Sequence, residues 1–315
     1  EYADLFPAWN WRRIPGTTTL QLRPPLDPHT PIPIAGRRDF AGGASDGIVG
    51  CLGYDFAAGA DPRGPDQIRA RKSWFFFGAE IVALGAGISA STPEPVLTTL
   101  NQCRGIGPVL LGDGRRHTSI RRGPFRSERL KWIHHDQVAY LLLQPAVVEG
   151  SIGPVAGDWN RINGQIPSRP VRDRLFDLGI PHGIRPRQAR YAYLILPGCT
   201  PDQADLAAQS RPVEILANTP RLQAIRHRER GIIQAVFYRA GVLRHAEGWS
   251  LQVDRPCALI LHPDGRGNGR LTVGAPDHSS GKIRIQLRFF GYEKSIRLTL
   301  PDGNLAGRSV TRILP

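Results

Sequence analysis

A strict alternation of apolar and polar residues near the end of the chain limits what this sequence can fold into. From Lys282 to Phe289 the chain reads KIRIQLRF, so one face of an extended strand would carry only apolar side chains and the other only polar ones. A period of two is typical of a β-strand with one buried face. Ser295 to Leu300 (SIRLTL) repeats the pattern. These segments predict strands rather than helices.

Short apolar runs predict further strands along the whole chain. Their lengths suit strands buried on both faces, as in stacked sheets, and they lie at 74–77, 80–84, 139–143 and 192–196. Two more predicted strands, 257–261 and 270–273, flank a Pro-Asp-Gly turn within His262 to Gly269. With 35 Gly and 28 Pro among many short strands, an all-β sandwich architecture is expected.

Helical signals are confined to one place. Thr200 is suited to cap a helix, Pro201 to occupy its first position, and Gln203 to complete a capping box with Thr200. We therefore expect one short helix that continues to Gln209. The whole chain should contain well under about 15% helix, below the usual one third.

The sequence changes character just after this helix, near Ser210 to Pro212. A domain boundary is predicted there, which divides the chain into residues 1–212 and 213–315. The proline-rich stretch Pro24 to Pro33 is predicted to be a loop, because strand-like sequence lies on both sides of it.

The chain is strongly basic. It carries 41 Lys and Arg against 27 Asp and Glu, which gives a net charge of +14, and all but four of the 41 are Arg. A basic surface attracts polyanions, whether nucleic acid, anionic lipid or acidic glycan, and Arg binds carboxylates through a bidentate fork. The arginines are scattered through the predicted strands and no nucleic-acid-binding motif occurs, which argues against nucleic acid.

Several other classes of protein are disfavoured. No stretch approaches the roughly 20 apolar residues of a membrane span, and no P-loop, GxGxxG, GxSxG or HExxH motif occurs. The four cysteines form no CxxC pair, which argues against a zinc site and favours free buried thiols over a disulfide framework. The chain contains no Met and no visible signal peptide, so we expect it to be a piece of a longer protein.

One tight cluster of potential metal ligands occurs, His134-His135-Asp136. Adjacent residues on a strand point to opposite faces, so His134 and His135 are poorly placed to share a metal ion. A metal site is one interpretation. The other, which we favour, is one packed and one solvated histidine.

Trp9, Trp11 and Trp74 are candidate sugar-binding residues, because the C–H face of a sugar ring packs well on an indole ring. Arg12 and Arg13 lie beside the first two, and an acidic sugar offers both a C–H face and a carboxylate. The same residues would suit a stacked base and its phosphate, and each Trp can instead be a core residue. Composition alone leaves these alternatives open.

Several segments resemble the polysaccharide lyases of family 8, which include hyaluronate, chondroitin and xanthan lyases. They occur in the family's order from the first residues to about Cys257, and the PGTT and RKSWFFF segments are the most specific. The segments are Trp11–Thr19 (WRRIPGTTT), Phe40–Gly50 (FAGGASDGIVG), Ala70–Ile88 (ARKSWFFFGAEIVALGAGI), Thr98–Cys103 (TTLNQC), Trp132–Tyr140 (WIHHDQVAY), Tyr191–Gly198 (YAYLILPG) and Ile215–His227 (ILANTPRLQAIRH).

The resemblance implies a fold and a reaction. The family has an N-terminal helical toroid, a large antiparallel β supersandwich and a smaller C-terminal antiparallel β-sandwich, and this chain is similar to the last two. The reaction is β-elimination: a base removes the C5 proton of a uronate and the C4–O bond breaks, after hydrogen bonds have neutralised the carboxylate. In the family the Asn, His, Tyr and Arg that do this lie on the toroid. The resemblance therefore implies no catalytic residue in this chain, and we expect the chain alone to be inactive.

The resemblance also implies which residues face substrate, since the loop around PGTT reaches towards the active site in the family. The candidates are Arg12, Arg13, Thr18, Thr19, Gln21 and Trp74. Relatives often have an acidic residue just after this motif, whereas here no carboxylate follows before Asp27. The alternative for the motif is structural: a tight turn at Pro15-Gly16 followed by threonines in a strand.

The expected partners are an acidic polysaccharide, of glycosaminoglycan or xanthan type, and the helical toroid of the parent protein. No metal, cofactor, nucleic acid or membrane is expected, and the parent is expected to be secreted by a bacterium. The alternative function is that of a carbohydrate-binding β-sandwich protein without catalysis.

Overall fold

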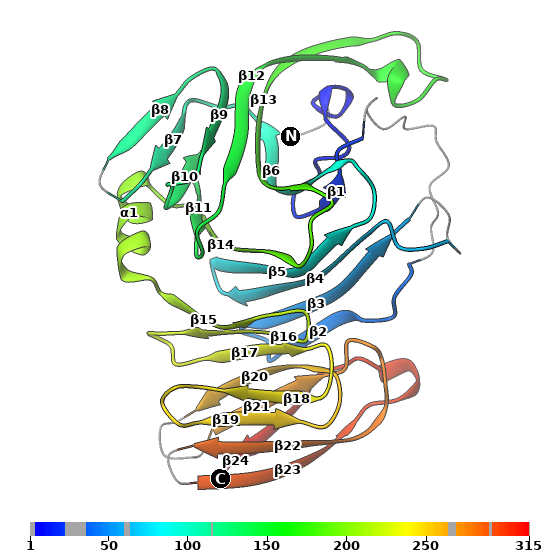
Figure 1. Ribbon diagram of the computed structural model, residues 1–315, viewed down its shortest axis with the longest axis vertical. Helices are drawn as coiled ribbons and strands as arrows, with labels where there is room; N and C mark the ends of the chain where they lie inside the picture. Colours follow the sequence, from blue (N-terminus) through cyan, green and yellow to red (C-terminus); the bar gives the residue numbers. More distant parts are fainter. Residues whose placement is uncertain are drawn as a thin grey trace. The chain divides into compact units, whose positions relative to one another are not determined.

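The computed structural model describes residues 4–22, 36–59, 64–114, 116–263, 269–289 and 292–314. In these residues strands dominate, and the helices are one α-helix of ten residues and three 3-10 turns of three residues each (Figure 1). The prediction of an all-β fold with little helix is confirmed. The predicted loop Pro24 to Pro33 lies outside the described residues.

The chain forms two compact units whose segments alternate along the sequence. Unit 1 comprises Glu1–Ala35, Ala58–Ile68 and Ser89–Gln209, and unit 2 comprises Gly36–Ala57, Arg69–Ile88 and Ser210–Pro315. The two compact units therefore do not correspond to a division of the chain at one boundary, because each unit is built from three separate segments. The boundary between residues 212 and 213 stays a prediction.

Unit 1 contains a five-stranded antiparallel sheet with its longest strands in the middle. The strand order is β1 (Thr18–Leu20), β6 (Pro95–Arg104), β13 (Pro170–Ile184), β12 (Val148–Asp158) and β9 (Gly123–Ser127). β12 and β13 pair without interruption from Glu149 opposite Gly179 to Asp158 opposite Pro170. The 3-10 turns η1 (Phe6–Ala8) and η2 (Trp159–Arg161) also belong to this unit.

A second group of strands in unit 1 carries the helix. Its order is β14 (Ala189–Pro197), β11 (Val138–Leu142), β10 (Trp132–His135), β7 (Val109–Gly112) and β8 (His117–Ile120), with α1 at Pro201–Ser210. The capping box is present as predicted, since Gln203 N donates to Thr200 Oγ1 (3.3 Å) and Thr200 N donates to Gln203 Oε1 (2.8 Å). Trp132, which is fully buried, donates from Nε1 to Asp205 on the helix at 2.6 Å.

Unit 2 contains a true sandwich. A six-stranded sheet and a four-stranded sheet share one apolar core. The six-stranded sheet consists of β15 (Val213–Asn218), β16 (Leu222–His227), β17 (Ile233–Phe237), β20 (Cys257–Pro263), β21 (Gly269–Gly274) and β24 (Val310–Leu314). The four-stranded sheet consists of β18 (Gly241–Arg244), β19 (Ser250–Val253), β22 (Gly281–Phe289) and β23 (Tyr292–Leu300). The alternation in 282–289 acts as predicted: Ile283, Ile285 and Leu287 face this core. The turn η3 (Gly303–Leu305) precedes the last strand.

The other strands of unit 2 are β2 (Ala41–Ser45), β3 (Gly50–Ala58), β4 (Ile68–Phe77) and β5 (Glu80–Ala90). β4 and β5 extend well beyond the predicted runs 74–77 and 80–84. β5 is buried continuously from Val82 to Ile88, which agrees with the prediction of a strand covered on both faces.

The turn between β2 and β3 is fixed by one buried carboxylate. Asp46, with a side chain only 1% exposed, accepts hydrogen bonds from the N–H groups of Ile48 and Val49 and from His262 Nε2 and Arg270 Nη2, all between 2.7 and 3.0 Å. Burial raises the pKa of Asp46, but the two backbone hydrogen bonds, His262 and Arg270 together outweigh it and leave the pKa below its ordinary value. The turn is therefore tied to β20 and β21.

The cysteines agree with the sequence-based expectation. All four cysteines are free thiols, and Cys51, Cys199 and Cys257 are buried, as predicted. Among the described residues, no helix has the length and apolar character needed to cross a membrane.

We predict that Gly112→Ala will destabilise unit 1, whereas Gly153→Ala will not. A Cβ on Gly112 would lie 2.1 Å from Cε2 of the buried Trp132 ring, and a Cβ on Gly153 would meet no atom within 4 Å. Overpacking should lower the free energy of unfolding of Gly112→Ala by about 1–3 kcal/mol, against a change within about 0.5 kcal/mol for the control. Urea unfolding measures the free energy of unfolding of both variants. Equal decreases in the two variants would contradict the prediction.

We also predict that Asp46 stabilises unit 2 in a pH-dependent way. Because its folded pKa lies below the unfolded value of 3.8, its contribution is fully present above that value and is lost as the pH falls through the folded pKa. Asp46→Asn should lower the free energy of unfolding at pH 7 by about 1–3 kcal/mol, and the difference from wild type should shrink towards acid pH. The exposed Asp302→Asn is the control; a difference that does not depend on pH would refute the prediction.

Candidate functional site

The segment that precedes the PGTT motif is held against the five-stranded sheet by one buried amide. Gln102 on β6 is 1% exposed. Its Oε1 accepts from the Asn10 N–H at 2.9 Å, and its Nε2 donates to the carbonyls of Asn10 and Arg13, both at 3.1 Å. These bonds fix the backbone on both sides of Trp11 and Arg12.

The motif itself forms a tight turn followed by a strand, as the structural interpretation predicted. Thr17 donates from both N and Oγ1 to the Ile14 carbonyl (3.1 and 2.7 Å), and Gly16 has φ +80°, a conformation that favours glycine. The Gly16 N–H donates to the Thr99 carbonyl of β6 at 2.9 Å. β1 then begins at Thr18. Whether the turn also contacts substrate stays a prediction.

The predicted residues of the motif lie in two environments. Thr18 is 2% exposed, and its hydroxyl is hydrogen-bonded to that of Thr98 at 2.8 Å. Thr19 and Gln21 are partly exposed. Thr19 Oγ1 donates to the Arg12 carbonyl at 2.6 Å, and Gln21 Nε2 donates to Thr19 Oγ1 at 3.0 Å. Thr19 and Gln21 thus close a small network with the backbone of Arg12.

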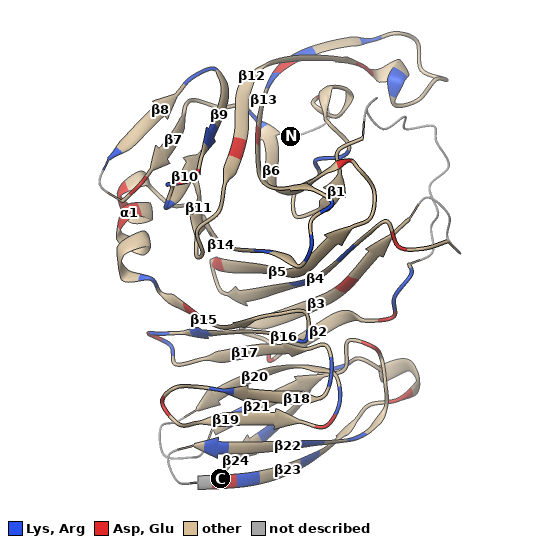
Figure 2. Cartoon of the chain, viewed as in Figure 1, with Lys and Arg blue, Asp and Glu red and all other residues tan. Residues whose placement is uncertain are grey.

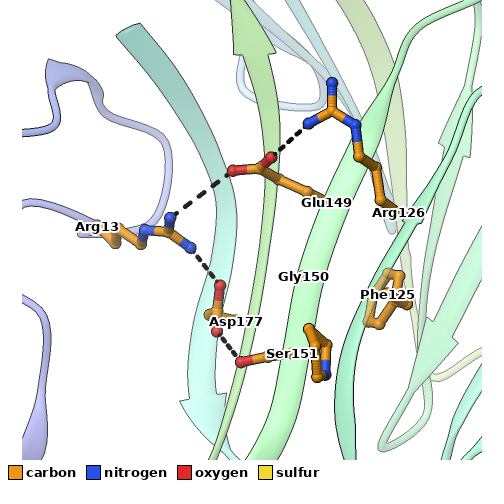
Figure 3. A pocket seen from close by; sticks show the side chains of 8 residues that line it. Arg13, Phe125, Arg126, Glu149, Gly150, Ser151 and Asp177 are labelled. Carbon is orange, nitrogen blue, oxygen red and sulfur yellow. Dashed lines mark hydrogen bonds and ion pairs between the residues drawn. The ribbon is translucent and has the colours of Figure 1, made fainter. Parts of the chain in front are cut away.

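Arg13 is the centre of a network of charged side chains (Figure 3). Its Nη1 donates to Asp177 Oδ1 at 2.6 Å, its Nε donates to Gln21 Oε1 at 3.2 Å, and its Nη2 lies 3.7 Å from Glu149 Oε1. Asp177, only 8% exposed, also accepts from the Ser151 hydroxyl at 2.5 Å. The guanidinium group is therefore oriented on three sides, with a quarter of its side chain exposed.

Arg126 brings a second guanidinium group to the same place. It lies directly opposite Glu149 in the β9–β12 pair, and its Nη1 donates to Glu149 Oε2 at 2.9 Å. The Arg126 side chain is 59% exposed. Glu149 thus bridges Arg13 and Arg126, in the arrangement that Figure 3 shows.

Two adjoining cavities of about 420 and 700 Å³ share Arg13, Arg126 and Glu149. Cavities of this size suit small ligands or short segments of a polymer. The first cavity is also lined by Phe125, Gly150, Ser151 and Asp177. The second is also lined by Gln21, Leu22, Glu94 and Ile184. We call this region the arginine–carboxylate site.

The segment before the motif also carries buried N–H donors. Trp11 Nε1 and Arg12 Nε have no hydrogen-bond partner among the described residues. Trp11 packs with Trp9 and Phe6, with ring centroids 5.8 and 5.9 Å from its own. Such unsatisfied buried donors are uncommon in folded proteins and often mark places where a ligand binds.

Trp74 belongs to unit 2. It lies on β4 and is partly exposed, and the ammonium group of Lys72 lies 5.2 Å from the centre of its ring. Burial lowers the pKa of Lys72 to about 7. Trp74 therefore has the partial exposure that ring stacking on a sugar requires, and its contact with substrate stays a prediction.

The two adjacent histidines have separate partners. His134 Nε2 lies 2.7 Å from the Cys199 carbonyl oxygen, whereas His135 is buried, stacks on Phe176 and has Nδ1 3.7 Å from Cys103 Sγ. Burial lowers the pKa of His135 to about 4. In the described part of the chain, no three His, Cys, Asp or Glu side chains are grouped to hold a metal ion.

The sequence analysis missed most members of the site, among them Arg126, Glu149, Ser151 and Asp177. One signal was available: Asp177 interrupts the apolar run from Leu175 to Ile180, where a carboxylate needs a partner. Nothing local marked Arg126, because charged residues are spread over the strands and connections of both units (Figure 2). Only the register of β9, β12 and β13 brings these residues together.

Profiles of one family match almost the whole chain. The super-sandwich domain of polysaccharide lyase family 8 matches residues 1–208, and the C-terminal beta-sandwich domain of the same family matches residues 214–284.

Curated relatives agree. The chain is 33% identical over 320 residues to chondroitinase-AC of Pedobacter heparinus, 30% identical over 292 residues to hyaluronate lyase of Thermasporomyces composti, and 30% identical over 247 residues to xanthan lyase of Bacillus sp. strain GL1. These matches cover 98%, 90% and 75% of this chain but only 43%, 36% and 26% of the relatives. The chain thus spans less than half the length of each.

Solved structures show the same fold. A chondroitinase AC lyase, solved in complexes with oligosaccharides, superposes with a TM-score of 0.88 at 32% identity, over 99% of this chain and 45% of that one. A Paenibacillus xanthan lyase gives a TM-score of 0.82 at 20% identity, over 96% of this chain and 31% of that one, and supports the fold alone. The chain therefore belongs to polysaccharide lyase family 8, of which it contains the super-sandwich and C-terminal β-sandwich regions.

Proposed function

We propose that this chain is the β-sheet portion of a lyase that cleaves uronate-containing polysaccharides by β-elimination. The substrate would be a polymer of the hyaluronan, chondroitin or xanthan type. The catalytic base and the groups that neutralise the uronate carboxylate would come from a helical toroid elsewhere in the parent protein. The parent would act outside a bacterial cell, where such polymers are found.

The arginine–carboxylate site is the observation that carries this proposal. It places two arginines beside the motif segment, one of them held by Asp177 and the other largely exposed. Arginine binds carboxylate and sulfate groups through paired N–H donors. The net charge of +14 on the whole chain would attract a polymer with one acidic group in each repeat.

The arrangement can bind and orient but has no evident acid–base pair. Glu149 and Asp177 are already bound to arginines, so both are poorly suited to remove a weakly acidic C5 proton. A guanidinium group near a uronate carboxylate would stabilise the negative charge that develops as the proton leaves.

We predict that the 315-residue chain alone will release no unsaturated uronate from hyaluronan or chondroitin. The product is followed by its absorbance near about 232 nm, which arises from the double bond formed in the elimination. The parent protein with its helical domain should show steady turnover under the same conditions. Turnover by the chain alone would place the catalytic groups within these residues and overturn the proposal.

We also predict that Arg13→Lys in the parent enzyme will lower kcat/KM on polymer by about tenfold, because Lys keeps the charge but loses the fork that reaches Asp177 and a ligand together. Because Lys keeps the charge, long-range attraction is unchanged and the ratio of kcat/KM between the two enzymes should not depend on salt. Arg104→Lys is the matched control, since Arg104 pairs with Asp173 at 2.8 Å on the same sheet and lines neither cavity.

Melting temperatures of both variants separate binding from folding. If Arg13→Lys lowers the melting temperature but leaves kcat/KM per folded molecule unchanged, Arg13 is a structural residue and does not contact substrate. If the two variants lose activity equally, the arginine–carboxylate site has no special part in the reaction.

A further inference from the structure

Unit 2 has a groove of its own, of about 540 Å³, that shares no residue with the arginine–carboxylate site. The turn between β2 and β3 forms one side, the end of β4 another, and the segment before β24 a third. Its side chains include Ile48, Leu52, Phe76, Arg308 and Ser309.

Three large apolar side chains of this groove are exposed to solvent. Ile48 is 71% exposed, Leu52 39% and Phe76 38%. Single exposed apolar residues need no explanation, but a group that lines one concave surface indicates a binding site. Phe76 adds an aromatic ring of the kind on which the C–H face of a sugar packs.

Glycine main chain forms much of the rest of the groove. Gly47, Gly78 and Gly307 line it with φ between +71° and +90°. No atom lies within 4 Å of the position that a Cβ on Gly47 would take, so a flat ring can approach the peptide group there, whereas Arg230 lies beside Gly78 and His278 beside Gly307.

The groove is also preformed. Asp46 fixes the turn that carries Gly47 and Ile48 through hydrogen bonds to the Ile48 and Val49 N–H groups. Ser309 Oγ accepts from the Ser45 N–H at 3.0 Å and joins the third side of the groove to the first. A site that is rigid before binding loses less entropy when it orders a ligand.

The charge at the groove is positive. Arg308 is exposed, and no carboxylate of the described residues lies within ion-pair distance of its guanidinium group. Arg230 is similarly without an ion pair in the described part of the chain. Its Nη2 lies 3.8 Å from the position that a Cβ on Gly78 would take, which brings a second guanidinium group beside the groove. Asp46, in the turn that borders the groove, has a buried side chain that already pairs with His262 and Arg270.

We propose that this groove is a second binding site for acidic polysaccharide, which holds the polymer without chemistry. The apolar faces of sugar rings would pack on Phe76 and Leu52, their hydroxyl groups would bond to Ser309 and the glycine peptides, and their carboxylates would pair with Arg308 and Arg230. The choice of an acidic glycan rests on the proposed function. The combination of an aromatic ring, open peptide groups and unpaired arginines supports it independently of the arginine–carboxylate site.

The test is isothermal titration calorimetry of the 315-residue chain with hyaluronan and chondroitin hexasaccharides at low salt. Arg308→Gln should weaken binding about fivefold, as expected for one partly screened ion pair. Phe76→Ala should weaken it about two- to tenfold through loss of ring stacking. Arg297→Gln on β23, also exposed, removes the same charge away from the groove and should leave binding unchanged. A neutral dextran oligosaccharide should not bind.

Hydrogen exchange locates the ligand. Glycan should slow exchange in peptides that cover Ser45 to Leu52, and Arg308→Gln should reduce that protection at the same glycan concentration. Because Phe76 and Arg308 are exposed, loss of folding is not expected, and unchanged melting temperatures verify this.

The possible failures point to different conclusions. The double variant Arg13→Gln/Arg126→Gln tests the arginine–carboxylate site. If this variant loses all binding while Arg308→Gln and Phe76→Ala bind as well as the wild type, the groove proposal is overturned. The proposed function is not affected by that result. If the chain binds no acidic hexasaccharide, the groove proposal also fails. The proposed function is judged separately by turnover of the parent enzyme. Equal weakening by Arg297→Gln would show that charge alone, and no site, attracts the glycan.

Discussion

The charge of Asp177 is the constraint on which the arrangement of unit 1 depends. Its carboxylate lies on β13, within a strand that is buried on both sides of it, and it is 8% exposed. A charge in such a place must be compensated. Ser151 supplies one hydrogen bond from the neighbouring strand, and Arg13 supplies the counter-charge at 2.6 Å. The N-terminal segment must therefore lie across the sheet, and the amide of Gln102 holds it there.

This constraint has a consequence for function. Arg13 is placed by a buried partner rather than by solvent-exposed ones, so its guanidinium group has a defined position before any ligand arrives. Glu149 then connects it to Arg126 across the β9–β12 pair. A preorganised pair of cations is what an acidic polymer needs for binding in register, and this is why we assign binding and orientation to this portion of the lyase.

Asp46 obeys the same rule in unit 2. This buried carboxylate accepts hydrogen bonds from two backbone N–H groups, a histidine and an arginine. These bonds fix the turn that borders the groove of unit 2. In both units a buried acid organises the loop that carries the candidate binding residues. Glycines complete the arrangement where chains approach closely: a Cβ on Gly274 would lie 2.2 Å from the Gly43 carbonyl oxygen.

The sequence by itself determined the fold class, several of the strands and the helix. Alternation in 282–289, apolar runs such as 192–196, and the Thr200–Gln203 capping box depend on contacts between near neighbours, which a local pattern records. The PGTT turn was recognised for the same reason, since Gly16 has to adopt a positive φ. Tertiary structure alone decided which residues meet Arg13. Asp177 is 164 positions away, and Glu149 and Arg126 join it only through the register of three strands. Likewise, Phe76 and Arg308 line one groove although their positions in the sequence differ by 232. The sequence could not predict these contacts, because pairing between distant strands leaves no periodic pattern in it.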